Sequence, residues 1–84
     1  MTDTVIAGRQ NIEVARLIVL RGALRIEIIT EGRMQATGKI TALKAFHNIV
    51  GEELGMKPLR GQKGRLAALE IVDSILASVG VSKP

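Results

Sequence analysis

The chain has 84 residues, no cysteine, one aromatic residue and a formal net charge of +4. The lack of cysteine excludes disulfide bonds and cysteine-based metal sites. With one aromatic residue, the chain is also poorly suited to bind single-stranded nucleic acid by stacking bases on aromatic side chains. A chain this short buries only about 60% of its unfolded surface, so we expect association between copies to stabilise it. The longest strongly apolar run, "LIVL" at residues 17 to 20, lies between two arginines and is too short to span a membrane.

The positive charge favours anionic partners such as nucleic acid, nucleotides or acidic proteins. Eleven of the twelve Lys and Arg residues lie between Arg9 and Arg65. We expect one domain over residues 1–84, with residues 1–10 and 80–84 as flexible tails. The lack of cysteine fits a reducing compartment, so we expect a cytoplasmic protein without a membrane partner.

The first expected helix covers residues 12–30, with Asn11 as its N-cap and Glu13 in the first turn. Its last part, "RIEIIT", alternates and also fits a strand, but no second alternating run follows to pair with it. Two apolar stripes lie on nearly opposite sides of this helix. One stripe contains Leu17, Leu20, Leu24 and Ile28, and the other contains Ile12, Ala15, Val19, Ile26 and Ile29.

Two partner helices in one chain can cover only one of these stripes. Leaving the other stripe in water would forgo about 1.5 to 3 kcal/mol for each large aliphatic side chain. The pattern therefore predicts a homo-oligomer in which the first helix packs against the same helix of another copy. The alternative is that the other two helices wrap around both stripes.

Two further helices are expected at residues 40–54 and 65–79, separated by a turn at "GMKPLRGQ". Gly55 and Gly80 are the expected ends of these helices. The predicted fold is therefore all-α, with three helices.

The stretches "TGKITAL" and "KGRLAAL" begin the second and third expected helices with a glycine followed by a cation. Helix starts expose backbone N–H groups that suit phosphate, and a cation there is unfavourable unless an anion offsets it. The alternative is that both are ordinary helix starts with solvated charges. A P-loop is excluded, because five residues instead of four separate Gly32 from Gly38, and Ile40 replaces the metal-binding hydroxyl.

Arg21 and Arg25 lie four residues apart, and in an oligomer two such pairs could meet at a shared anion. The alternative is that both snorkel to water beside an apolar interface. The candidate ligand-binding residues are Arg21, Arg25, Arg33, Thr37, Gly38, Lys39, Thr41, Arg60, Lys63, Gly64 and Arg65.

No arrangement of residues indicates catalysis. The single histidine, His47, is expected in the core or an interface, and no nucleophile or metal-ligand spacing accompanies it. We therefore expect a protein that is not an enzyme and that holds no cofactor and no metal.

The runs "VARLIVLRGALRIEI" and "ALKAFHNIVGEELGMK", followed by a basic glycine loop, resemble a family of small helical proteins encoded by bacteriophages and some bacteria, including cyanobacteria. The resemblance covers about residues 12 to 70 and carries no activity with it. A phage origin favours small binders that block host proteins, coat nucleic acid or sequester signalling nucleotides.

Together these patterns predict a non-catalytic binder of a phosphate-bearing ligand, with a nucleotide-type small molecule preferred. The cations are spread over loops and do not form a stripe on one exposed helix, as a groove reader would require. The alternatives are a nucleic-acid-binding protein without sequence preference, and a scaffold or inhibitor of other proteins.

Overall fold

The structure is a computed structural model that describes residues 4–7, 10–35 and 38–81. Within them lie two strands, β1 (Thr4–Ala7) and β2 (Gln10–Glu13), and three helical segments. These are α1 (Val14–Ile29), α2 (Ala42–Phe46) with its π-helical continuation η1 (His47–Gly51), and α3 (Gly61–Ser78). The prediction of a mostly helical chain with three helices is confirmed. In this part of the chain, no helix combines the length and the apolarity that crossing a membrane requires.

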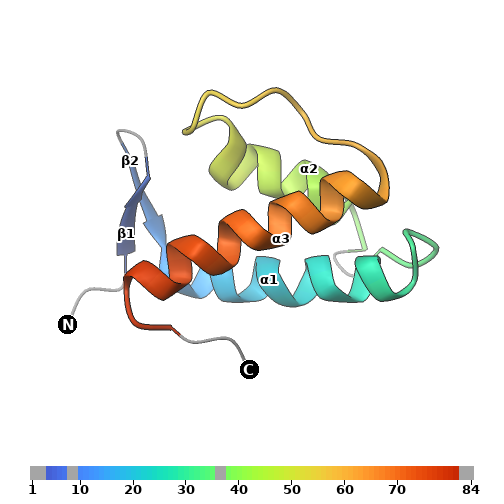
Figure 1. Ribbon diagram of the computed structural model, residues 1–84, viewed down its shortest axis with the longest axis horizontal. Coiled ribbons are helices and arrows are strands. Elements are labelled where there is room, and N and C mark those ends of the chain that lie inside the picture. Colours follow the sequence, from blue (N-terminus) through green and yellow to red (C-terminus); the bar gives the residue numbers. More distant parts are fainter. Residues whose placement is uncertain (1–3, 8–9, 36–37, 82–84) are drawn as a thin grey trace.

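Helices α1 and α3 lie side by side, and α2 packs against both of them (Figure 1). The hairpin of β1 and β2 lies at the end of the molecule where α1 begins and α3 ends. Its strands are antiparallel, with Thr4 paired with Glu13. The sequence was expected to form a tail up to residue 10 and a helix from residue 12, but β-branched residues such as Thr4 and Val5 favour extended backbone.

The core forms where the three helices meet. From α1 come Leu17, Leu20 and Leu24, and from α2 and η1 come Phe46 and Val50, all 2% exposed or less. Val72 and Leu76 of α3 complete it with no exposed surface. The first predicted stripe of α1 therefore faces the core.

The second predicted stripe of α1 faces the solvent. Val19 is 71% exposed, Ile26 47% and Ile29 78%. Ile12 is buried, but it belongs to β2 rather than to the helix. These exposures contradict the alternative in which the other two helices wrap around both stripes.

Helix α2 begins at Ala42, two residues later than predicted, and its first turn is capped from two directions. The hydroxyl of Thr41 accepts a hydrogen bond from the backbone N–H of Lys44 at 3.0 Å. The backbone N–H of Ala42 donates to both carboxylate oxygens of Glu27, each at 2.9 Å. Glu27 is 1% exposed, so a buried carboxylate from α1 lies at the positive end of α2.

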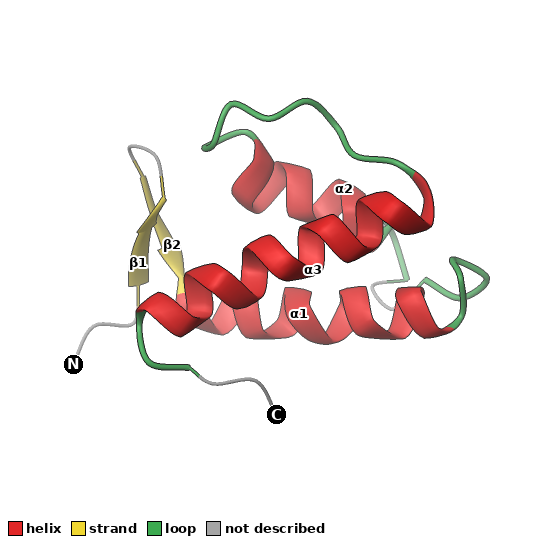
Figure 2. Cartoon of the chain, viewed as in Figure 1, coloured by secondary structure: helices red, strands yellow, loops and turns green. Residues whose placement is uncertain are grey.

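The second helix ends as a π-helix at Gly51, three residues before the predicted end. At Gly51 an added Cβ would lie 2.8 Å from Nδ1 of His47, so the imidazole packs directly against the glycine. A loop over residues 52–60 then leads to α3 (Figure 2). Gly55, the predicted cap, lies in this loop with a φ of 68°.

Helix α3 begins at Gly61 rather than at residue 65. Pro58 and Gly61 suggested a longer turn, but Gly61 adopts a φ of 70° and starts the helix directly. Gly80 and Val81, expected in a tail, end α3, because their N–H groups donate to the carbonyls of Ala77 and Leu76. The other expected tail residues, 1–3, 8–9 and 82–84, lie outside the described part of the chain.

We predict that Glu27→Ala lowers the free energy of unfolding by about 3 kcal/mol, because it leaves the buried N–H of Ala42 without its acceptor and removes the charge at the start of α2. Glu27→Gln keeps an acceptor oxygen at the same place and should lower it by only about 1 kcal/mol. Chemical denaturation followed by circular dichroism measures both. Equal stability of wild type and Glu27→Ala would show that this contact does not stabilise the fold.

Candidate functional site

A depression of about 300 Å³ lies between the start of the second helix and the end of the loop before α3. Residues from both segments form its wall, so the site depends on the packing of the loop over α2. The lining residues are Thr41, Leu43, Lys44, His47, Pro58, Leu59, Arg60 and Gly61.

The described side chains that line this depression include basic groups and no carboxylate. Lys44 and Arg60 are exposed, and His47 is half-buried. The oxygen of Thr41 accepts the N–H of Lys44, which leaves its hydroxyl hydrogen available to a ligand. Leu43, Pro58 and Leu59 supply an apolar part of the wall. The depression therefore combines two cations, an imidazole and a hydroxyl donor beside an apolar surface.

The π-helical turn of η1 lies at this site. The ring of His47 rests on Gly51, the last residue of η1. Short π-helical turns inside α-helices occur frequently at functional sites. His47, expected in the core or an interface, is half-buried and lines the depression.

Two of the predicted site residues, Thr41 and Arg60, line the depression together. Lys44 and His47 were missed, although Thr41, Lys44 and His47 follow each other at intervals of three, which places them on one side of a helix. That spacing was a usable signal. The position of Arg60 beside these residues could not be predicted from spacing, because it depends on how the loop folds back over the second helix.

Two N–H groups at the start of α2, where "TGKITAL" was expected to hold a phosphate, have acceptors within the protein. Ala42 donates to Glu27 and Lys44 donates to Thr41. Gly38 and Lys39 precede the helix and are exposed, with Gly38 at a φ of 76°. Thr37 lies outside the described residues. The anion at this helix start is therefore the carboxylate of Glu27.

The second stretch, "KGRLAAL", lies inside α3 rather than at its start, which removes the premise of a phosphate-binding turn there. Gly64 is buried, and an added Cβ would lie 3.1 Å from both the carbonyl carbon and the Cβ of Leu59. This glycine permits close packing of the loop on the helix. Lys63 is exposed.

Arg65 and Gln62 meet the end of α1. The guanidinium of Arg65 lies against Gly32 and donates to Oε1 of Gln62 at 2.8 Å. The amide of Gln62 donates to the carbonyl of Ile28 at 2.9 Å. This places a cation near the negative end of α1, where the helix dipole favours it.

The three remaining candidate arginines lie beside carboxylates of the protein. Arg21 and Arg25 of α1 approach Oδ1 of Asp73 in α3 at 3.9 and 4.0 Å. Arg33 contacts Glu31 at 3.2 Å on the surface. Within one chain, the anion near Arg21 and Arg25 is Asp73, which is 8% exposed.

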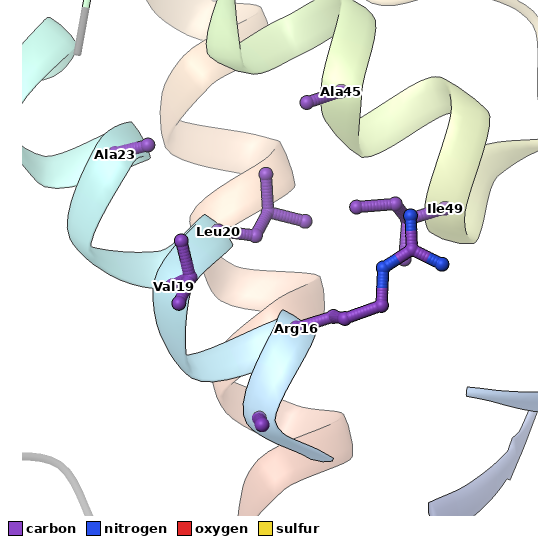
Figure 3. A pocket seen from close by; sticks show the side chains of 7 residues that line it. Arg16, Val19, Leu20, Ala23, Ala45 and Ile49 are labelled. Carbon is purple, nitrogen blue, oxygen red and sulfur yellow. The ribbon is translucent and has the colours of Figure 1, made fainter. Parts of the chain in front are cut away.

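A second, apolar groove of about 360 Å³ lies between α1 and the second helix (Figure 3). Arg16 reaches across its mouth toward the helix that carries Ile49. The apolar groove and the basic depression have no lining residue in common. The lining residues are Ala15, Arg16, Val19, Leu20, Ala23, Ala45 and Ile49.

Comparisons with protein-family models, with curated proteins and with solved structures found no match. Within the described residues, no group of three His, Cys, Asp or Glu side chains could hold a metal ion.

We predict that Asp73→Ala lowers the free energy of unfolding by about 3 kcal/mol, because it removes the carboxylate that faces the buried Arg21. The double variant Arg21→Met with Asp73→Leu should recover most of this loss, since apolar residues of similar volume replace the charge pair. Thermal and urea unfolding of the three proteins measures the effect. A double variant less stable than Asp73→Ala would contradict this account.

Proposed function

We propose that the protein binds a phosphate-bearing small molecule of the nucleotide type in the basic depression, without converting it. The observation that supports this is the convergence of Lys44, Arg60 and His47 on one depression whose described lining contains no carboxylate. Thr41 adds a hydroxyl donor at the same place. Cations and neutral donors beside an apolar wall suit a ligand with a charged end and a flat uncharged part.

The size of the depression sets the class of ligand. Its volume of about 300 Å³ is at the lower limit for small-molecule pockets. It therefore suits the phosphate and part of the nucleoside better than a large dinucleotide. The guanidinium of Arg60 can contact a phosphate with two N–H groups, and Lys44 adds a compact charge.

The proposal is for binding alone, because the described lining carries no carboxylate that would orient His47 as a general base. A histidine in that role is usually held by a third polar group, most often a carboxylate. Here the ring packs on Gly51 instead. In the phage setting that the resemblance implies, such a binder would withdraw a signalling nucleotide from the host cytoplasm.

We also propose that the protein acts as a homo-oligomer joined through α1. The support is the exposed apolar stripe of this helix, in which the side chains of Val19 and Ile29 are 71% and 78% exposed.

We predict that Lys44→Ala and Arg60→Ala each weaken binding by about 1.5 to 3 kcal/mol, which is roughly a 10- to 100-fold rise in Kd. Both side chains are exposed, so the fold should stay intact. Calorimetric titration and thermal shift with a panel of nucleotides and inorganic phosphate measure this. Lys57→Ala is the matched control, since Lys57 is an exposed cation of the same loop that does not line the depression.

Binding that is unchanged in Lys44→Ala and Arg60→Ala would overturn the site. A short DNA duplex belongs in the same titration. Duplex binding with a steep salt dependence, without nucleotide binding, would replace the proposal with the nucleic-acid alternative.

A further inference from the structure

The outer face of α1 is apolar across its whole width. At 100° per residue, six exposed positions fall within about 100° of the helix circumference, opposite the side that carries Leu17 and Leu24. A surface helix ordinarily places charged and polar residues there. The six residues of this outer face are Ala15, Ile18, Val19, Gly22, Ile26 and Ile29.

The packing of the chain leaves this face uncovered. Helices α2 and α3 lie on one side of α1 in the ribbon diagram, and the described residues place no helix on the other (Figure 1). The exposed fractions agree, at 41% for Ile18, 71% for Val19 and 78% for Ile29.

We propose that the outer face docks on the same face of a second copy, with the two α1 helices antiparallel and crossing at Gly22. A glycine inside a helix is unfavourable relative to alanine. Gly22 has no contact inside the chain that requires it, since an added Cβ would meet nothing within 4 Å. A second helix that approaches closely at this point supplies the missing reason.

The sizes of the side chains favour the antiparallel direction. Ala15, Gly22 and Ile29 recur every seventh residue along the middle of the outer face. An antiparallel crossing at Gly22 places Ala15 opposite Ile29 of the second copy, so that a small residue faces a large one twice. A parallel pair would place the two Ile29 side chains against each other and leave a gap at the two Ala15 residues.

The apolar groove lies along one edge of the outer face. Its wall includes Ala15 and Val19, which also belong to the outer face (Figure 3). A twofold axis that relates antiparallel helices brings the same edge of each helix together. Ile26 of the second copy then lies opposite Val19, over the groove that ends at Ile49 of η1.

The area that a stable dimer must bury supports a second copy of the chain as the partner of this surface. A standard interface buries about 800 Å² on each partner. From Ala15 to Ile29 the outer face is about 21 Å long and one helix wide, which is too small alone. The adjoining groove extends the apolar surface, and a second copy supplies the same combined surface. Because the outer face carries no charge, an acidic or basic partner would gain no complementarity from it.

Analytical ultracentrifugation of the wild type is the first measurement, and we expect a particle of twice the 9.0 kDa chain mass at micromolar concentration. Ile26→Lys should raise the dimer dissociation constant roughly 100-fold or more. Leu66→Lys is the matched control, because Leu66 of α3 is 49% exposed, close to the 47% of Ile26, and lies off the outer face. Circular dichroism of each variant checks that the helices persist.

Cysteine cross-linking decides the direction, and the absence of natural cysteines makes it unambiguous. The cross-links are formed under mild oxidation. Ala15→Cys should link to Ile29→Cys in a mixture but not to itself. Self-linked Ala15→Cys and Ile29→Cys dimers would overturn the antiparallel arrangement. A wild type that sediments as a monomer throughout the concentration range would overturn the self-docking surface altogether.

This inference rests on the proposed assembly and not on the ligand site. Nucleotide titration of the monomeric Ile26→Lys variant separates the two. Ligand binding with wild-type affinity by that variant would leave the binding function standing whatever the cysteine results show.

Discussion

The contact between Glu27 and the start of α2 is the constraint on which the rest of the structure depends. A buried carboxylate is costly unless hydrogen bonds satisfy it, and both of its oxygens accept the N–H of Ala42. Since Glu27 lies near the end of α1, this contact sets where α2 begins against that helix. One side of the second helix then meets α1 and the groove, through Ala45 and Ile49. The other carries Lys44 and His47 to the basic depression.

A second consequence concerns how this small chain uses its charges. Several cations that the sequence predicts as ligand-binding residues lie beside carboxylates or amides of the protein. Arg21 and Arg25 approach Asp73, and Arg65 is hydrogen-bonded to Gln62 over the end of α1. The contacts with Asp73 and the hydrogen bond from Gln62 to the carbonyl of Ile28 join α1 to α3, where an 84-residue chain has little apolar core to spare. The described cations that remain exposed are spread along the chain, and the loop before α3 brings Arg60 beside Lys44 of the second helix, which is why the depression is basic.

The local elements could be predicted from the sequence better than their boundaries and their partners. The period of 3.6 residues predicted all three helices, and the stripe containing Leu17 and Leu24 is buried as expected. The hairpin was missed, since its two four-residue strands are too short for a clear alternation. The sequence also predicted Thr41 and Arg60, which line the depression, and it predicted a phosphate at the helix start in "TGKITAL". The carboxylate of Glu27, 15 residues earlier, occupies that helix start, and no local pattern reveals a contact at that separation.

The two surfaces of the second helix are separate in space as well as in chemistry. The groove that adjoins the outer face of α1 and the depression around Lys44 and Arg60 have no lining residue in common. Covering the groove in an antiparallel dimer would therefore leave the depression open in each copy. Such a dimer would carry two ligand sites whose occupation need not alter the interface, since a ligand shifts an assembly only through a difference in affinity between its states. Binding and assembly would then be independent properties, with assembly serving the stability of a chain too short to bury both faces of α1.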